Sequence, residues 1–134
     1  MNSWFADTFY FLALRNSQDE YHARAVAVSA QMGKRPLVTT AWVLTEVADA
    51  LAKPHNRSGF AELLSVLSAN PDALVVPPTQ ALFELGIAYY NSRPDMGWSL
   101  TDCISFLVMA ERQITEALTG DHHFEQAGFR ALLK

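Results

Sequence analysis

The chain has 134 residues, of which 50% are hydrophobic and 18% charged, and its formal net charge is −4. This length fits one domain, residues 1–134, with a sizeable core, and the composition excludes a disordered chain. The acidic balance excludes a protein that coats nucleic acid by bulk charge attraction. It is compatible with an enzyme that has a local basic rim around an acidic centre.

The same composition bears on location and redox chemistry. No apolar run approaches the ~20 residues that a membrane-spanning helix needs. The first residues lack the basic segment and the small-residue cleavage site of a signal peptide. One cysteine, Cys103, excludes an internal disulfide framework. We therefore expect a cytoplasmic protein without a membrane association, in which Cys103 packs as a small apolar side chain.

Short strand-like runs alternate with helical patterns along the chain. In chain order, we predict a strand at 3–7, helices at 8–15 and 21–33, a strand at 35–41, helices at 42–53 and 58–70, a strand at 73–78, helices at 79–93 and 99–113, a strand at 115–121, a helix at 122–128 and a strand at 129–133. Gly33, Pro54 and Pro71 mark helix ends, because glycine favours the turn after a helix and proline cannot continue one.

Strands that are separated by helices, with few hairpin signals, indicate an α/β fold with a mostly parallel sheet. We predict a three-layer α/β/α sandwich around a central sheet of about five strands. Residues 104–110 are apolar on nearly all sides, so the helix that contains them should be the most deeply buried one. In such sheets, functional groups gather at the carboxyl ends of the strands.

Four acidic residues lie where this rule directs attention. Asp7 and Asp121 end the first and fourth predicted strands. Glu46 lies in the helix after the second strand, and Asp102 lies in the first turn of the buried helix. Each also has a structural interpretation. Asp7 and Asp121 can cap the helices that follow them, Asp102 can form a capping box with Ser99, and Glu46 can be a solvated helix residue. Capping does not explain why an acid recurs at these strand exits.

Four segments carry a family resemblance: FADTFYFLAL (5–14), LTEVADAL (44–51), SLTDCISFLVM (99–109) and LTGDHHFEQAGF (118–129). In order and spacing they resemble the four acidic motifs of PIN-domain nucleases, and most of all the bacterial VapC-type ribonucleases of toxin–antitoxin systems. The resemblance covers nearly the whole chain. It implies one acidic pocket that is formed by Asp7, Glu46, Asp102 and Asp121. The sequence departs from the common pattern at Phe9, where a small residue is usual.

The resemblance implies a metal-dependent endoribonuclease. Clustered carboxylates repel one another, and a hard divalent cation relieves that repulsion. Oxygen ligands favour Mg²⁺ or Mn²⁺ over softer metals, and a bound metal activates water without a side-chain nucleophile. We expect Asp7 and Asp102 to be direct ligands, while Glu46 and Asp121 complete the site directly or through water. The hydroxyl groups expected to support the carboxylates or a metal-bound water belong to Thr8, Ser99 and Thr101.

Other residues near these motifs have weaker interpretations. A basic rim that holds RNA phosphates is predicted from Arg15, Lys53 and Arg57, although each fits plain solvated charge as well. His122 and His123 follow Asp121, but we expect adjacent histidines to point to different helix faces, and no HExxH or CxxC pattern is present. We therefore do not predict a zinc site. Trp98 is expected to be a packed anchor rather than a base-stacking platform, and His22 to be a surface residue.

The resemblance also implies partners. It indicates RNA as the substrate, with 5′-phosphate and 3′-hydroxyl products, a homodimer, and a small antitoxin that inserts a segment into or beside the acidic groove. The acidic balance fits an inhibitory segment that carries Arg or Lys. Two alternatives stay open at this point. A non-catalytic PIN-like module that binds RNA or protein is disfavoured by the presence of all four acids. A receiver-like phosphoacceptor domain is disfavoured because its paired acids and its lysine are missing.

Overall fold

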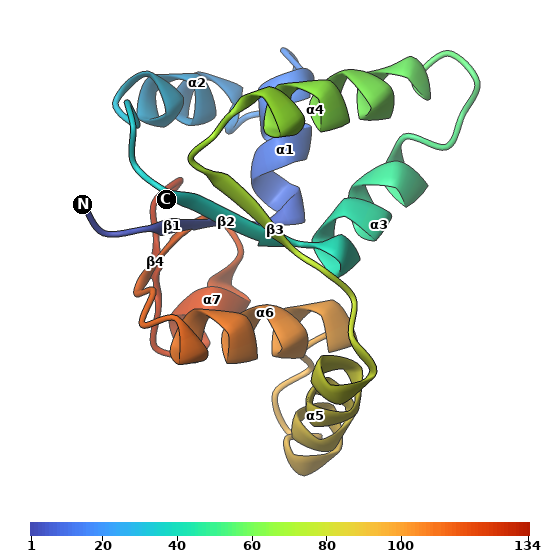
Figure 1. The fold of residues 1–134 in the computed structure, drawn as a ribbon, viewed down its shortest axis with the longest axis vertical. Helices are drawn as coiled ribbons and strands as arrows, with labels where there is room; N and C mark the ends of the chain where they lie inside the picture. The colour runs from blue at the N-terminus through green and yellow to red at the C-terminus, as the bar shows by residue number, and fades with distance from the viewer.

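The computed structural model describes residues 1–134 (Figure 1). Its elements are β1 (Trp4–Ala6), α1 (Thr8–Arg15), α2 (His22–Ala30), β2 (Leu37–Thr40), α3 (Ala41–Ala50), α4 (Ser58–Ala69), β3 (Ala73–Val76), α5 (Gln80–Ser92), α6 (Leu100–Glu111), β4 (Glu116–Leu118), α7 (His122–Gln126) and β5 (Arg130–Ala131). Every predicted element is present, and every strand is shorter than predicted. None of the helices is long and apolar enough to cross a membrane.

The strands form one parallel sheet in the order β3-β2-β1-β4-β5. The chain moves outwards from β1 through β2 to β3, and then returns to the other side of β1 with β4 and β5. The reversal places the carboxyl ends of β1 and β4 side by side. Open α/β sheets bind ligands at such a reversal point. The topology therefore brings the segment after β1 next to the segment after β4.

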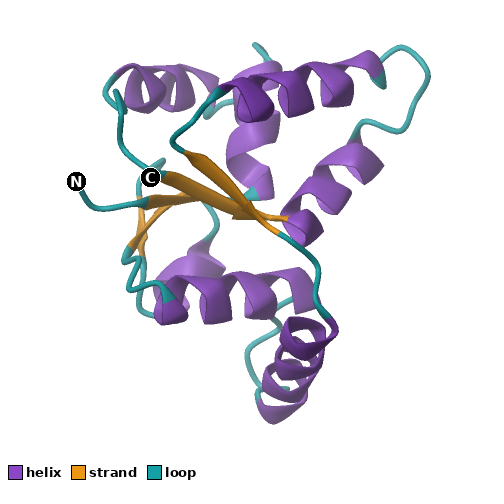
Figure 2. Cartoon of the chain, in the orientation of Figure 1, coloured by secondary structure: helices purple, strands orange, loops and turns teal.

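Helices cover both faces of the sheet, which confirms the predicted α/β/α architecture. In Figure 1, α1, α2, α3 and α4 lie on one side of the strands and α6 and α7 on the other. Figure 2 shows the strands between these two layers. Helix α5 packs against α6, on the side that faces away from the sheet.

The core fixes the position of α6 against the sheet. As predicted, α6 is the most deeply buried helix, and Cys103 within it is buried. The ring of Phe124 in α7 lies 5.0 Å from that of Phe106 in α6 and 6.3 Å from that of Phe5 in β1. Burial of each such side chain stabilises the fold by roughly 1.5–3 kcal/mol. This aromatic packing joins β1, α6 and α7, the elements that carry or adjoin three of the four predicted acids.

Two sequence expectations about local structure were wrong. Strand β4 ends at Leu118 rather than at residue 121, because Thr119 forms a turn in which its N–H donates to the Ala117 carbonyl at 3.0 Å. His22 is half-buried rather than at the surface. Its Nδ1 donates to the Ala13 carbonyl at 2.8 Å, since a carbonyl oxygen only accepts, and this bond ties α2 to α1.

Candidate active site

A groove of about 1010 Å³ lies at the carboxyl edge of the sheet, next to β1 and β4. It is lined by all four acids singled out from the sequence: Asp7, Glu46, Asp102 and Asp121. Two of the three predicted supporting residues, Thr8 and Ser99, also line it, whereas Thr101 does not. We call this space the acidic groove. The strand order explains the convergence, because each acid comes from a segment that starts at this edge.

Asp7 follows β1 directly and is 6% exposed. It occupies the N-cap position of α1, but its side chain forms no capping hydrogen bond, so the capping interpretation fails here. Its Oδ2 accepts a hydrogen bond from the Thr119 hydroxyl at 2.9 Å. Burial raises the pKa of Asp7 from 3.8 to about 7; the hydrogen bond from Thr119 opposes this, and the nearby charges of Asp102 and Glu46 add to it. The ionised carboxylate therefore lacks sufficient stabilisation from the chain alone.

Asp102 has a structural role and a place in the groove at the same time. Its N–H donates to the Ser99 hydroxyl at 3.0 Å, and its Oδ2 accepts from the Ser99 N–H at 3.1 Å, which completes the capping box of α6. The same Oδ2 accepts from Nδ1 of His123 at 3.0 Å. Two donors occupy the two lone pairs of Oδ2, while Oδ1 forms no hydrogen bond within the chain. One oxygen holds the helix, and the other is left for a ligand.

Glu46 and Asp121 are also held by neighbours. Glu46 is half-buried, and its Oε1 accepts from the Thr8 hydroxyl at 2.7 Å, so it is not a freely solvated helix residue. Asp121 caps α7, as the capping interpretation predicted, by accepting from the His123 N–H at 2.9 Å. The four acids thus include two helix caps, one hydroxyl-bound glutamate and one buried aspartate without a capping role.

Thr119 is a residue that supports two of the groove acids from below the groove lining, and the sequence reasoning missed it. Its hydroxyl donates to Asp7 and accepts from the Asp121 N–H at 3.0 Å, so it connects the segments after β1 and β4. The side chain is fully buried. In the sequence, Thr119 stands two residues before Asp121 in the segment LTGD. Its hydroxyl group can contact both Asp7 and the Asp121 N–H only because β4 ends before it, at Leu118.

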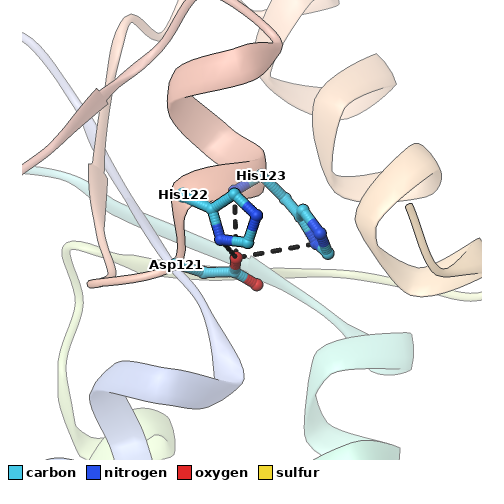
Figure 3. Close-up of side chains that lie close together, drawn as sticks. All are labelled: Asp121, His122 and His123. Atoms are coloured by element: carbon cyan, nitrogen blue, oxygen red, sulfur yellow. Dashed lines mark hydrogen bonds and ion pairs between the residues drawn. The ribbon is translucent and has the colours of Figure 1, made fainter. Parts of the chain in front are cut away.

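The two histidines lie closer together than expected (Figure 3). Their ring centroids are 4.4 Å apart, and one ligand atom from each of Asp121, His122 and His123 lies within 4.8 Å of the others. Nδ1 of His122 is 3.6 Å and Nδ1 of His123 is 3.5 Å from Asp121 Oδ1, so the expectation that the two rings diverge was wrong. His123 lines the acidic groove, whereas His122 does not and is exposed.

Phe9, the departure from the common motif, is accommodated by a glycine on another segment. Its ring packs edge-on against Tyr21 at 4.8 Å and lies against Gly120. A Cβ on Gly120 would come within 2.6 Å of the Phe9 ring. The missing side chain at this position therefore makes room for the bulky ring beside the acids.

The family model of the PIN domain matches residues 5–130. The chain belongs to the PIN domain family. Its fold is similar to that of VapC20 from Mycobacterium tuberculosis, a toxin that cleaves the sarcin–ricin loop, with a TM-score of 0.83 and 25% sequence identity over 93% of this chain and 95% of that one. These findings confirm the resemblance to VapC-like PIN proteins.

A second solved structure, FitAcB from Neisseria gonorrhoeae, is similar in fold, with a TM-score of 0.65 and 16% identity over 95% of this chain and 94% of that one. Comparison with curated protein sequences gives no match. Membership of the PIN family excludes the receiver-like phosphoacceptor domain as an alternative.

The basic residues of the predicted rim lie away from the acids of this PIN domain. None of the three lines the acidic groove: Arg15, Lys53 and Arg57. Arg15 pairs with Glu62 at 3.2 Å and lines a neighbouring hollow that shares Leu12 with the groove. Lys53 and Arg57 are exposed in the segment between α3 and α4. Their contact with RNA stays a prediction.

Proposed function

We propose that this PIN-domain protein is a Mg²⁺- or Mn²⁺-dependent endoribonuclease and the toxin of a toxin–antitoxin pair. The observation that carries the proposal is the convergence of four carboxylates, from the segments after β1 and β4 and from α3 and α6, on one groove. The likeness to VapC20, a toxin that cleaves the sarcin–ricin loop, supports RNA as the substrate. We extend the proposal to a cytoplasmic homodimer that is restrained by a small antitoxin with an Arg- or Lys-bearing segment.

The donor set of the groove fits a hard divalent cation. Carboxylate and hydroxyl oxygens are the ligands that Mg²⁺ and Mn²⁺ favour. Asp102 Oδ1 has no hydrogen bond within the chain, and Asp7 is a buried carboxyl whose charge needs a counterion. We expect these two side chains to hold the cation, while Glu46 and Asp121 complete its surroundings directly or through water.

The remaining residues orient the carboxylates. When bound, the cation supplies an activated water and polarises the scissile phosphate. Thr119 fixes Asp7 through Oδ2, and the Ser99 N–H together with His123 fixes Asp102 through its own Oδ2. Thr8 fixes Glu46. These three acids are therefore held in set orientations before the cation binds, which reduces the reorganisation that catalysis requires.

The proposal is tested by RNA cleavage with the purified protein. Cleavage should need Mg²⁺ or Mn²⁺ and stop with EDTA. Asp7→Asn and Asp102→Asn should each abolish it while the circular dichroism spectrum stays unchanged. Asp49→Asn, a change at an exposed acid on the helix that carries Glu46, is the matched control and should retain full activity. Full activity of Asp102→Asn, or cleavage that persists in EDTA, would overturn the metal mechanism, whereas no cleavage by the wild type with either cation would favour the non-catalytic binding module.

A further inference from the structure

A second hollow of about 240 Å³ adjoins the acidic groove at the C-terminal end of α5. The two spaces share four lining residues: Tyr90, Asn91, Gly97 and Trp98. The second hollow also contains Arg93 and Pro94, from the turn between α5 and α6. The shared residues make the two spaces one continuous groove, which begins at the carboxylates and ends at Arg93.

Trp98 is not available to a ligand in this groove. It is 6% exposed, and its Nε1 donates to Gln126 at 3.1 Å. Its ring lies 5.8 Å from that of Tyr89 and 5.1 Å from that of Phe106, and the Arg93 guanidinium lies 5.3 Å from its centroid. The indole is enclosed by neighbours, which agrees with the expected role as a packed anchor.

Tyr90 differs from Trp98 in each of these respects. It is 48% exposed, its ring belongs to none of the aromatic pairs of the fold, and its hydroxyl forms no hydrogen bond within the chain. Its neighbour Tyr89 carries the packing against Trp98. Leaving a large ring in water forgoes the stabilisation of burial. A flat ligand that lies on the ring would recover it.

The surroundings of Tyr90 favour a flat and uncharged ligand. Asn91 is exposed beside it and has a free amide, which donates and accepts hydrogen bonds. Gly97 has a φ of +69°, and a Cβ there would meet no atom within 4 Å, so the groove is open to the backbone at this point. Arg93 donates to both carboxylate oxygens of Asp95 at 3.1 Å, so its charge is already balanced. A phosphate is therefore not the ligand that this end of the groove attracts.

We propose that Tyr90, Asn91 and Gly97 form a nucleobase subsite, which stacks the base of the nucleotide next to the phosphate at the acids. This inference rests on the proposed ribonuclease function. Unpaired bases of single-stranded RNA stack on exposed aromatic rings and bond to side-chain amides. Stacking on Tyr90 tolerates any base, whereas hydrogen bonds to Asn91 give a preference among them. The subsite selects unpaired RNA, because a base inside a duplex cannot reach the ring.

The test uses a short single-stranded RNA that the wild type cuts at one site. Tyr90→Ala should raise KM about 5- to 150-fold, the usual effect of losing one stacked base, with a smaller effect on kcat. Tyr90→Phe should behave as the wild type. Tyr90→Leu keeps an apolar side chain without a flat ring, and should resemble Tyr90→Ala. Leu85→Ala removes a side chain that is 60% exposed on the same helix but outside the groove, and should change nothing.

Abasic RNA makes the test independent of any structural effect of the substitutions. One abasic nucleotide at the stacked position should reduce kcat/KM of the wild type at least as much as Tyr90→Ala does, because it removes the hydrogen bonds to Asn91 as well as the stacking. It should cost Tyr90→Ala much less than it costs the wild type, because the stacking contact is already lost in that variant. Independent, additive effects, or an unchanged KM in Tyr90→Ala and Tyr90→Leu, would overturn the subsite and leave the ribonuclease standing. If the wild type cuts no RNA with Mg²⁺ or Mn²⁺, the proposed function fails and the subsite fails with it.

Discussion

The exit of β1 and the start of α6 each bring a buried aspartate to the same groove, but the chain supports the two carboxylates differently. Asp102 accepts two N–H groups on Oδ2, one of which belongs to the capping box that α6 needs in any case. Asp7 caps nothing and has a raised pKa, because it is buried with only partial compensation. Folding explains an acid at Asp102. It does not explain an acid at Asp7.

This difference means that equivalent substitutions should have unequal effects on the metal-free protein. A variant at Asp7 changes the cost of a buried charge, whereas a variant at Asp102 changes a helix cap that asparagine can also supply. The effect on ligand binding should be similar at the two positions, because both side chains line the groove. Two measurements therefore separate the roles of each aspartate. The stability of the metal-free protein reports its role in folding, and the additional stability that metal gives reports its role in ligand binding.

The largest effect is expected for Asp7→Asn in metal-free protein. Because the pKa of Asp7 is raised from 3.8 to about 7, ionising it in the folded state costs about 4 kcal/mol. Asp7→Asn removes this cost, so at pH 8 in EDTA it should raise the free energy of unfolding by up to about 4 kcal/mol. Urea unfolding of the wild type, Asp7→Asn and the exposed control Asp49→Asn measures the difference. A destabilised Asp7→Asn protein would mean that the chain does stabilise the ionised carboxylate.

The same comparison has a pH dependence with a defined sign. Between pH 4 and pH 7, the folded state holds a proton on Asp7 that the unfolded state has released. The folded state therefore binds more protons in this window, and the stability of metal-free protein falls as the pH rises through it. Other groups also titrate, so the quantity to measure is the difference between the wild type and Asp7→Asn. That difference should be near zero at pH 4, grow up to about pH 7 and stay level above it.

The second effect concerns His123, which reaches the start of α6 from the segment after β4. His123→Ala should weaken Mn²⁺ binding by about 10- to 100-fold, or about 1.4–2.8 kcal/mol, because Asp102 loses a donor that orients it. His123→Asn should restore much of the affinity, since its amide N–H can replace Nδ1. Isothermal titration with Mn²⁺ measures these affinities. His122→Ala is the control, and an equal loss in that variant would indicate direct ligation by the imidazoles instead.

The sequence predicted the elements and the acids of this site better than the hydrogen bonds between them. The alternation of strands and helices gave the parallel sheet, and the rule for strand ends then pointed to Asp7 and Asp121. The role of Thr119 depends on where β4 ends, which its own segment does not reveal. The contact of His123 with Asp102 depends on how α7 packs against α6. Local patterns predict which elements form, but they carry no information about side chains that meet across elements.

The contact between Phe9 and Gly120 is a second one between elements that the sequence alone does not reveal. A bulky residue beside the first acid looked like a departure from the family pattern. Gly120, on the segment after β4, leaves the room that the ring needs. Neither residue explains itself alone, and the compensation is visible only once β1 and β4 are placed side by side. The unpacked ring of Tyr90 likewise could not be told from a core aromatic by its helical spacing.

The smallest effect on metal-free stability is expected for Asp102→Asn, and it makes the comparison sharpest. The asparagine carbonyl can accept from the Ser99 N–H and from His123 as Oδ2 does now, so α6 keeps its cap. Loss of one of several like charges also favours the folded state slightly. The change in EDTA should stay within about 1 kcal/mol.

The stabilisation that Mn²⁺ gives should nevertheless fall, because a ligand of the folded state stabilises it in proportion to its affinity. Thermal melts of wild type and Asp102→Asn, with EDTA and with Mn²⁺ at constant ionic strength, measure both quantities. Equal metal-induced shifts in the two proteins would leave Asp102 with its capping role alone, and Asp7 would then be the one aspartate of the pair that serves the groove.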